Sequence, residues 1–328
     1  MKALVYWPSA PARVIEYLVE SLNRITGVET ARDLDDAMLK VRGSEIFVGQ
    51  LSNKILEEAR KLRFAQVTSA GVDHLDLEMA KSRGILLASA KGANSFYVAE
   101  LALALILALA KRVVDMDRSA KSGVFPEYSW GIGSLSTLRG KTVVIYGYGG
   151  IGRELARLLK PLGAKIIGVR RSVKESFDDG HAVVVGPGQS WEYLARADFL
   201  VVAVPLTKET RRLVNRDFLS RLKRGSYLIN VSRGEVVDED ALYDALSNGR
   251  LAGAGIDTWW LYPEDDRGRG TAYSSRGIHK LPNVVAIPHR GGFVEEAFMD
   301  VAKLAVRNVE RFLKGEPVEG LVDYEKGY

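Results

Sequence analysis

Two residues of this chain have side chains suited to proton transfer and anion binding, and both follow apolar runs. His289 comes directly after such a run and a proline, and imidazole is the side chain best suited to exchange a proton near neutral pH. Arg233 follows a second apolar run, and its guanidinium can bind a carboxylate through two N–H donors. Each has a plainer alternative: His289 as a hydrogen-bonded loop residue, and Arg233 as the ion-pair partner of Glu235 or Asp238. The spacing alone leaves both alternatives open.

A glycine-rich turn at 147–152 follows the apolar run 142–146 and has the pattern G-x-G-x-x-G. Residues 153–162 are predicted to be helical and residues 165–169 to form the next strand. In this context the pattern is typical of a dinucleotide site: the first glycine permits a tight turn, the second lets backbone approach a pyrophosphate, and the third packs helix on strand. N–H groups at the helix start would bind the phosphates. The residues predicted to bind the dinucleotide here are Gly147, Tyr148, Gly149, Gly150, Ile151 and Gly152.

The end of the next strand indicates which dinucleotide is bound. An NAD site usually has an acidic residue there for the ribose hydroxyls, whereas this chain has Arg170, Arg171 and Ser172. An acid would repel a 2′-phosphate, but two guanidinium groups and a hydroxyl would bind one. We therefore predict a preference for NADP(H), with NAD(H) as an alternative cofactor.

The elements that must position these residues alternate between strand and helix, which predicts parallel sheets covered by helices on both faces. A length of 328 residues exceeds one ordinary core, so two domains are expected. The expected fold class is α/β, with two doubly wound domains of Rossmann and flavodoxin-like type. The predicted strands are 2–7, 45–50, 64–68, 85–89, 142–146, 165–169, 182–185, 199–204, 227–231, 253–256 and 284–287, and the predicted helices include 12–25, 53–62, 75–83, 98–114, 153–162 and 294–314.

The composition argues against several other classes of protein. The net charge is +5, but Lys and Arg are mixed with nearly as many acidic residues, so no nucleic-acid partner is expected. There are no cysteines and four histidines without a close pair, so no metal site is expected. The apolar stretch 101–110 is too short to span a bilayer, which takes about 20 residues, and the start of the chain is not a signal peptide. We expect no membrane partner and a cytoplasmic location.

Ligands of open parallel sheets bind beyond the carboxyl ends of the strands, so the residues just after each predicted strand are expected to form one site. Polar or glycine residues follow the strands at 147–152, 170–172, 205–207, 232–234, 257–258 and 289–290. One more turn, Ser69-Ala70-Gly71, follows a strand near the start of the chain. Its backbone N–H groups could bind an anion, or it could be a plain strand-to-helix turn.

With these residues assembled, the chain resembles the D-isomer-specific 2-hydroxyacid dehydrogenases over nearly its whole length, and within them the NADP-type glyoxylate/hydroxypyruvate reductases. Seven ordered segments carry the resemblance: 68–73, 94–95 with 98–100, 138–142, 205–207 with Thr210, 230–234, 255–257 and 288–289. It implies two similar α/β domains with a cleft between them. The substrate domain would be 1–97 plus 292–328, and the NAD(P)-binding domain 98–291. It also implies a homodimer formed largely through the cofactor domains.

The resemblance implies a role for each site residue. Arg233 would bind the carboxylate and carbonyl of the substrate, and His289 would be the general acid–base. Ser69, Ala70 and Gly71 would bind the substrate carboxylate through their backbone. Besides the glycine turn and Arg170 to Ser172, the implied cofactor contacts are Val204, Pro205, Thr210, Val231, Ser232, Asp257 and His289, with Asp257 near the nicotinamide.

One position departs from the family pattern. Members usually carry a Glu five residues after the Asp, before a Pro, and it pairs with the catalytic His; here that position is Tyr262. Glu264, two residues further on, could reach His289 only through a local bulge. A carboxylate partner raises the pKa of a histidine, so with neutral Tyr262 we expect His289 to protonate at lower pH than in relatives. Reductase activity should then fall off at lower pH than is usual for the family. The neighbouring Trp259 and Trp260 could line the pocket or cover the dimer interface.

The predicted function is hydride transfer between NADP(H) and a small 2-oxoacid or D-2-hydroxyacid, with glyoxylate or hydroxypyruvate as the substrate type. One alternative is a nucleotide-sensing, corepressor-like binding protein, which the missing Glu favours and the intact Arg233 and His289 oppose. Another is a related dehydrogenase of formate or 3-phosphoglycerate. The phosphorylated substrate would need further cations near the pocket, for which Arg290 is a candidate.

Overall fold

The computed structural model describes residues 1–125, 135–263 and 273–328 of the chain. The described chain forms two compact units, one made of Met1–Ser95 with Gly292–Tyr328 and the other of Phe96–Gly291. We call them unit 1 and unit 2 and describe each by itself.

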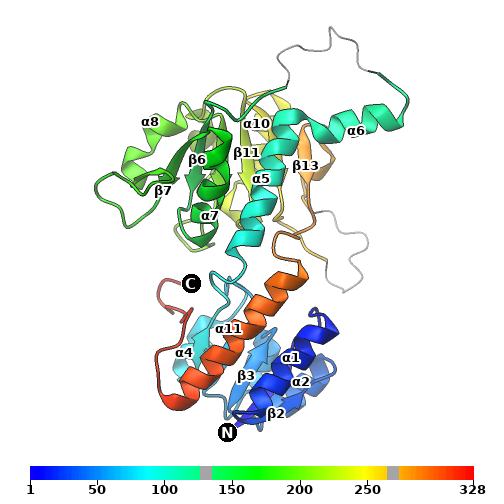
Figure 1. The fold of residues 1–328 in the computed structure, drawn as a ribbon, viewed down its shortest axis with the longest axis vertical. Helices are drawn as coiled ribbons and strands as arrows, with labels where there is room; N and C mark the ends of the chain where they lie inside the picture. The colour runs from blue at the N-terminus through cyan, green and yellow to red at the C-terminus, as the bar shows by residue number, and fades with distance from the viewer. Residues whose placement is uncertain (126–134, 264–272) are drawn as a thin grey trace. The chain divides into compact units, whose positions relative to one another are not determined.

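Unit 1 is built on a five-stranded sheet in the order β2-β1-β3-β4-β5, in which every neighbouring pair is parallel. Helices α1 and α11 lie side by side on one face of this sheet (Figure 1). Helices α2, α3 and α4 pack on the other face. The strands are β1 (Lys2–Tyr6), β2 (Gly27–Thr30), β3 (Ile46–Gly49), β4 (Phe64–Val67) and β5 (Leu86–Ala88), and the helices are α1 (Ala12–Asn23), α2 (Leu34–Val41), α3 (Asn53–Glu58), α4 (Leu77–Ser82) and α11 (Glu295–Lys314).

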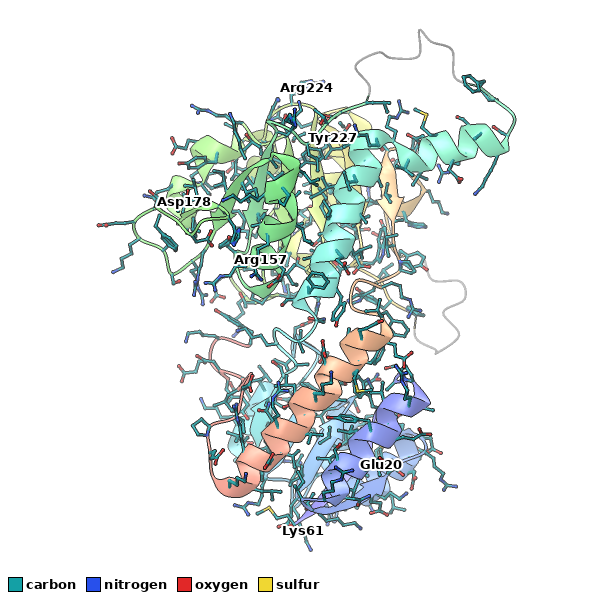
Figure 2. All side chains as sticks on the ribbon, viewed as in Figure 1. Glu20, Lys61, Arg157, Asp178, Arg224 and Tyr227 are labelled. Atoms are coloured by element: carbon teal, nitrogen blue, oxygen red, sulfur yellow. The ribbon has the colours of Figure 1, made fainter. Side chains whose placement is uncertain are left out.

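The helices of unit 1 follow from apolar stripes at helical spacing. In α1, Val14, Leu18 and Leu22 recur every fourth residue and are fully buried against the sheet. Glu20 on the same helix is exposed (Figure 2). The helix is therefore held by the burial of one face, as the periodicity predicts.

Unit 2 is built on an eight-stranded sheet in the order β13-β12-β11-β10-β6-β7-β9-β8. Helices α5 and α7 pack on one face, and α8, α9 and α10 on the other. The strands are β6 (Thr142–Tyr146), β7 (Lys165–Val169), β8 (Phe177–Asp178), β9 (Val183–Val185), β10 (Phe199–Val202), β11 (Ser226–Asn230), β12 (Leu251–Ile256) and β13 (Val284–Ala286). The helices are α5 (Ser95–Lys111), α6 (Val113–Lys121), α7 (Gly150–Leu159), α8 (Trp191–Leu194), α9 (Arg216–Ser220) and α10 (Glu239–Ser247), with 3-10 turns at Lys160–Leu162, Pro187–Gln189, Gly234–Val236 and Ile278–Lys280.

The order of these strands creates a ligand position in the middle of the sheet. β6 is the first strand of unit 2 along the chain, yet it lies between β7 and β10. The chain moves outward from β6 to β7 and later returns to β10 on the other side, so the connections diverge at the carboxyl end of β6. In open α/β sheets such a switch point is where ligands bind. Arg224 and Tyr227 mark the opposite, amino end of the strands, at the start of β11 (Figure 2).

Three features of the fold differ from the sequence-based expectations. β8 pairs antiparallel with β9, so the sheet of unit 2 is not wholly parallel; β8 is only two exposed residues and has no apolar pattern to predict it. The helix predicted over 98–114 is instead α5 and α6, because Arg112 adopts a left-handed φ of 50° between them. β2 and α2 were not predicted; β2 has four residues and none of them is buried.

The other predicted helices and strands are observed with ends that differ by a few residues. The helix predicted to start at Arg153, for example, already begins at Gly150 because Gly149 serves as its N-cap. Among the described residues, no helix combines the length and the apolar character needed to cross a membrane.

Candidate active site

The glycine turn after β6 has the backbone geometry that a bound pyrophosphate requires. Gly147 has a φ of 111°, and a Cβ there would lie 2.5 Å from the backbone of Ala203. A Cβ on Gly152 would lie 2.6 Å from the Gly147 carbonyl oxygen, so this glycine permits close packing of α7 on β6. At Gly149, by contrast, a Cβ would meet none of the described atoms within 4 Å. The turn therefore leaves space for a phosphate next to the first N–H groups of α7, which starts at Gly150.

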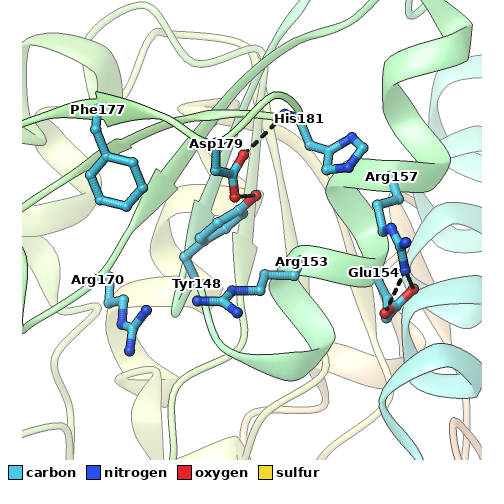
Figure 3. Close-up of a pocket in the computed structure, with 8 residues that line it drawn as sticks. All are labelled: Tyr148, Arg153, Glu154, Arg157, Arg170, Phe177, Asp179 and His181. Carbon is cyan, nitrogen blue, oxygen red and sulfur yellow. Dashed lines mark hydrogen bonds and ion pairs between the residues drawn. The ribbon is translucent and has the colours of Figure 1, made fainter.

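A pocket of about 450 Å³ lies beside this turn, between α7 and the end of β7 (Figure 3). Arg153 and Arg170 point toward the same end of it, whereas Arg157 turns to Glu154 and donates to both of its carboxylate oxygens at 3.2 and 3.4 Å. Within the described residues, the guanidinium groups of Arg153 and Arg170 form no ion pair or hydrogen bond. Both are therefore available to bind an anion. The lining residues are Tyr148, Arg153, Glu154, Arg157, Arg170, Phe177, Asp179 and His181.

Tyr148 lines this pocket and donates a hydrogen bond to Asp179, one of its two acidic residues. Its side chain is 2% exposed and lies so close to Gly168 of β7 that a Cβ there would come within 2.4 Å of the ring. The Tyr148 hydroxyl donates to Asp179 Oδ2 at 2.7 Å. Burial and this bond to a carboxylate raise the pKa of Tyr148, so the hydroxyl stays protonated as a donor.

The carboxylate of Asp179 is occupied by hydrogen bonds. Besides the Tyr148 hydroxyl, it accepts from the backbone N–H groups of His181 at 3.0 Å and Ala182 at 2.9 Å. Burial raises the pKa of Asp179, but the three hydrogen bonds outweigh this and hold the pKa below its usual value. The negative charge of Asp179 is therefore stabilised by local donors and does not neutralise the arginines of the pocket through an ion pair.

Arg170 and Arg171, which follow β7, interact with different parts of the structure. Arg170 lines the pocket of Figure 3, whereas the charge of Arg171 acts on Glu209 in the turn after β10. The pKa of Glu209 is lowered, first by a hydrogen bond from the Thr207 hydroxyl and in smaller part by Arg171. Ser172 is exposed in the turn that follows. The end of β7 thus places one positive charge, that of Arg170, beside α7 and a second, that of Arg171, within electrostatic range of the turn after β10.

Asn230 fixes the loop that carries Arg233. It is fully buried at the end of β11, and its Oδ1 accepts from the backbone N–H of Ser232 at 3.1 Å and from the Ser232 hydroxyl at 2.8 Å. Its Nδ2 donates to the Arg233 carbonyl at 2.9 Å. The Arg233 guanidinium in turn donates to the Ser232 carbonyl at 2.9 Å. One buried amide therefore sets the position of Arg233 at the strand end.

The two acids considered as ion-pair partners of Arg233 are paired elsewhere. Glu235 pairs with Arg211, and Asp238 pairs with Arg212 at 2.5 Å. Arg233 itself is half-buried. These pairings give no support to the alternative in which Arg233 is the ion-pair partner of Glu235 or Asp238.

His289 lies in a tight turn that follows β13. Its backbone N–H donates to the Ile287 carbonyl at 3.0 Å across Pro288, which makes a γ-turn. Its φ of 55° places it in the left-handed region, which costs a residue with a side chain roughly 1–3 kcal/mol. Such residues persist where surrounding contacts fix them, and they are concentrated at active sites.

Asp257 fixes the chain on the other side of His289. At the end of β12 it is 2% exposed, and its Oδ1 and Oδ2 accept from the backbone N–H groups of Arg290 at 2.7 Å and Gly291 at 3.1 Å. Burial raises the pKa of Asp257, although these two hydrogen bonds and the charge of Arg290 oppose the shift. Asp257 therefore restrains the position of His289 by binding the backbone N–H groups of the two residues that follow this histidine.

Tyr262 packs beside the imidazole of His289. The two ring centroids are 5.5 Å apart, with an angle of 53° between the ring planes. The Tyr262 hydroxyl accepts from the backbone N–H of Trp259 at 3.2 Å. Glu264, the alternative partner considered for His289, lies outside the described residues. The position at which the family usually carries a Glu is thus filled by a phenol in ring contact with His289.

The remaining predicted cofactor contacts lie at neighbouring strand ends. Val204 and Pro205 follow β10, and the Thr210 hydroxyl closes their turn by donating to the Pro205 carbonyl at 2.6 Å. Val231 follows β11 and is buried. Thr210 therefore shapes this turn through its side chain.

The turn predicted to bind the substrate carboxylate, Ser69 to Gly71, belongs to unit 1 and follows β4. The Ser69 hydroxyl donates to the Gly71 carbonyl at 2.8 Å, and the Ser69 carbonyl accepts from the Ala90 N–H at 2.9 Å. Ala70, between them, is half-buried. Local hydrogen bonds thus hold this turn.

Several residues of the site were not found from the sequence. Arg153 directly follows the glycine turn, so its position on the first turn of the helix was a usable signal. Asp179 and Asn230 gave no such signal, because their partners are set by the packing of the β8–β9 hairpin and of the loop after β11.

The glycine turn, Arg233 and His289 thus follow the carboxyl ends of strands of one open sheet, with the glycine turn at its switch point. This arrangement defines an NAD(P)-dependent dehydrogenase. The sequence profile of the D-isomer specific 2-hydroxyacid dehydrogenase NAD binding domain matches residues 103–291, and the chain belongs to this family. The resemblance seen in the sequence is thereby confirmed.

Known relatives agree with this assignment. The glyoxylate reductase of Thermococcus litoralis is 36% identical over 292 residues, which cover 87% of this chain and 85% of that protein. The D-3-phosphoglycerate dehydrogenase of Methanocaldococcus jannaschii is 30% identical over 315 residues, covering 94% of this chain but only 57% of that protein. The D-lactate dehydrogenase of Aquifex aeolicus, solved with NAD and lactic acid, has a TM-score of 0.79 and 26% identity over 96% of each chain. The chain is therefore an NAD(P)-dependent oxidoreductase of 2-oxoacids or 2-hydroxyacids.

Proposed function

We propose that this protein is an NADP(H)-preferring reductase of a small 2-oxoacid of the glyoxylate or hydroxypyruvate type. The cofactor choice is carried by the guanidinium groups of Arg153 and Arg170, which have no ion-pair partner within the described residues and line one pocket. Arg170 follows β7, at the strand end where an NAD site has an acid, and Arg153 lies on the first turn of α7. The substrate type follows from the glyoxylate reductase of Thermococcus litoralis, at 36% identity.

A nicotinamide cofactor held by the glycine turn and the arginines of the pocket would supply the hydride for the carbonyl carbon of the 2-oxoacid. Arg233 binds the substrate carboxylate through two N–H donors and polarises the carbonyl. The backbone N–H groups of Ser69 to Gly71 bind the same carboxylate. His289, in its imidazolium form, donates its proton to the carbonyl oxygen, and the product is the D-2-hydroxyacid.

The pocket of Figure 3 supports the preference for a 2′-phosphate. Arg153 and Arg170 can each offer charge-assisted hydrogen bonds to phosphate oxygens. Of the two acids of the pocket, Glu154 is paired with Arg157, and Asp179 accepts local hydrogen bonds without pairing with Arg153 or Arg170, so three arginines face two carboxylates. The site therefore presents net positive charge to the ribose of the cofactor.

The test of this proposal is NADPH and NADH consumption with glyoxylate, hydroxypyruvate, pyruvate and phenylpyruvate. We expect NADPH to be favoured in kcat/KM by roughly 10-fold or more, since hydrogen bonds to a charged group contribute about 1.5–3 kcal/mol. Arg170→Ala should raise the KM for NADPH by a similar factor and leave the KM for NADH unchanged. Equal efficiency of the wild type with NADH would contradict the cofactor proposal.

The double variant Glu154→Gln, Arg157→Gln is the control for this experiment. It removes the ion pair that lines the same pocket and leaves the net charge there unchanged. We expect its KM for NADPH to change little. Tight NADPH binding without turnover of any 2-oxoacid would favour a binding protein or a substrate of another class.

A second prediction concerns the pH dependence of reduction. Reduction consumes the proton of His289, so the rate falls as pH rises through the pKa of this histidine. Tyr262→Glu would place a carboxylate beside the imidazole, stabilise its charged form and raise its pKa. The descending limb of the reductase pH profile should therefore move to higher pH, by about 1 unit or more.

Tyr262→Gln is the control for this change, because it matches Glu in shape and has no charge. We expect its descending limb to stay near that of the wild type. If the descending limb of the Tyr262→Glu pH profile lies at the same pH as that of the wild type, residue 262 does not control the protonation of His289. A wild-type reductase profile that stays flat beyond pH 8 would contradict the underlying prediction.

The family resemblance also implies a homodimer formed through unit 2, and this remains part of the proposal. Large apolar side chains are exposed on α6 and just after it: Val113 is 53% exposed, Val124 57% and Phe125 92%. Exposed apolar side chains of this size are the kind that a protein–protein contact buries. Burial of Val113, Val124 and Phe125 between two copies of the chain would explain why apolar side chains are exposed in one copy.

A further inference from the structure

Trp259 lies three residues before Tyr262, in the core of unit 2. It is 3% exposed and packs against Tyr273 and His279, with ring centroids at 5.4 and 6.1 Å. From the sequence, Trp259 could have lined the pocket or covered a dimer interface. Its burial and its hydrogen bonds give it a different place, between the loop of Arg233 and the turn of His289.

The indole of Trp259 binds the turn that carries His289. Its Nε1–H donates to the Ile287 carbonyl at 2.7 Å. The same carbonyl accepts from the His289 N–H at 3.0 Å, so one oxygen joins the indole to the backbone of His289. Because His289 has a left-handed φ of 55°, its orientation depends on contacts that hold this turn in place.

The backbone of Trp259 binds the neighbours of His289 on two further sides. Its N–H donates to the Tyr262 hydroxyl at 3.2 Å, and the Tyr262 ring packs on the His289 ring. Its carbonyl lies against Gly234, where a Cβ would come within 2.2 Å of the Trp259 oxygen. Gly234 directly follows Arg233, so the same residue also supports the loop of the carboxylate-binding arginine.

We propose that Trp259 is the positioning residue for proton transfer in this protein. Its indole N–H fixes the His289 turn and its backbone N–H fixes the Tyr262 ring against the imidazole. Together these contacts orient His289 at the site where the family usually relies on a carboxylate partner. This inference rests on the proposed role of His289 as proton donor, and its test therefore includes a measurement that needs no turnover.

The test is Trp259→Phe, which keeps an aromatic ring but removes the N–H donor to Ile287. Trp260→Phe is the matched control: the Trp260 indole also donates to a backbone carbonyl, but to that of Val237 at 2.9 Å and not to one in the His289 turn. We expect Trp259→Phe to lower kcat roughly 10-fold to 100-fold, as displacement of a catalytic group does, with the KM for NADPH unchanged. Trp260→Phe should keep kcat near the wild-type value.

The measurement that needs no turnover is NMR of histidine-labelled protein, with the His289 signal assigned by its loss in His289→Asn. Faster exchange of the His289 amide proton and a shifted imidazole signal are expected in Trp259→Phe and not in Trp260→Phe. Should Trp259→Phe fold poorly, Tyr262→Phe, at a 46% exposed position, removes the hydroxyl bound by the Trp259 N–H and should also shift the imidazole signal.

Two results would overturn the inference. One is a Trp259→Phe enzyme with normal kcat and an unchanged His289 signal. The other is an equal loss of kcat in Trp259→Phe and Trp260→Phe, which would indicate a general loss of stability. If the wild type reduces no 2-oxoacid, the proposed function fails, while the amide exchange of His289 still decides whether Trp259 holds this turn.

Discussion

Replacing His289 with Asn is expected to lower kcat for 2-oxoacid reduction by about 10²–10⁴-fold, the usual contribution of a general acid. Asn cannot exchange a proton in the neutral pH range. It does tolerate the left-handed backbone conformation better than most residues, so the φ of 55° at this position can be retained. The variant therefore tests the imidazole and leaves the turn intact.

The check is a set of three measurements on His289→Asn. Steady-state kinetics gives kcat, fluorescence titration gives the Kd for NADPH, and thermal unfolding gives Tm. We expect kcat alone to change greatly, and we expect the residual activity to lose the descending limb of its pH profile. An unchanged kcat would remove His289 from the mechanism.

Replacing Arg233 with Gln is expected to lower kcat/KM for the 2-oxoacid by about 10²–10³-fold, because truncating one partner of a buried charge pair costs about 2–5 kcal/mol. Arg233 is half-buried, and its loop is fixed by the fully buried Asn230. The guanidinium is thus held in place before substrate arrives, which makes its loss more costly. Arg233→Lys should retain part of the activity, since it keeps the charge but loses the bidentate geometry.

The control for Arg233 is Arg212→Gln, which removes a guanidinium from an exposed pair with Asp238. Exposed pairs contribute little, so we expect this variant to keep its kcat/KM. The Kd for NADPH should be unchanged in both variants. A wild-type kcat/KM in Arg233→Gln would assign the substrate carboxylate to another residue.

Local sequence was sufficient to predict the glycine turn between β6 and α7. The three glycines of 147–152 act within one strand–turn–helix unit, and their constraints come from backbone a few residues away, such as the 2.6 Å approach of Gly152 to the Gly147 carbonyl. The central strands were equally predictable, because both faces are buried and the sequence shows continuous apolar runs. β2 and β8 lack such runs, since they lie at sheet edges where side chains remain exposed.

The neighbours of Arg170 and Arg171 in the folded protein could not be predicted from their adjacency in the sequence. The sequence placed Arg170 and Arg171 together as a phosphate clamp. In the structure Arg170 joins Arg153 and Tyr148 in one pocket, while Arg171 acts on Glu209 in the turn after β10. Residues that are neighbours along the chain contribute to different surroundings because α7 and the turn after β10 lie on different sides of the end of β7.

By itself the sequence determined the class of fold, the glycine turn, and the strand ends at which Arg233 and His289 lie, because each depends on periodicity or on backbone geometry over a short span. Only the tertiary structure decided what surrounds those two residues. The bonds from Trp259 to Ile287, from Asp257 to Arg290 and Gly291, and from Tyr148 to Asp179 join residues about 30 positions apart. Such contacts are set by which strand ends the folded sheet brings together, and no local pattern encodes them.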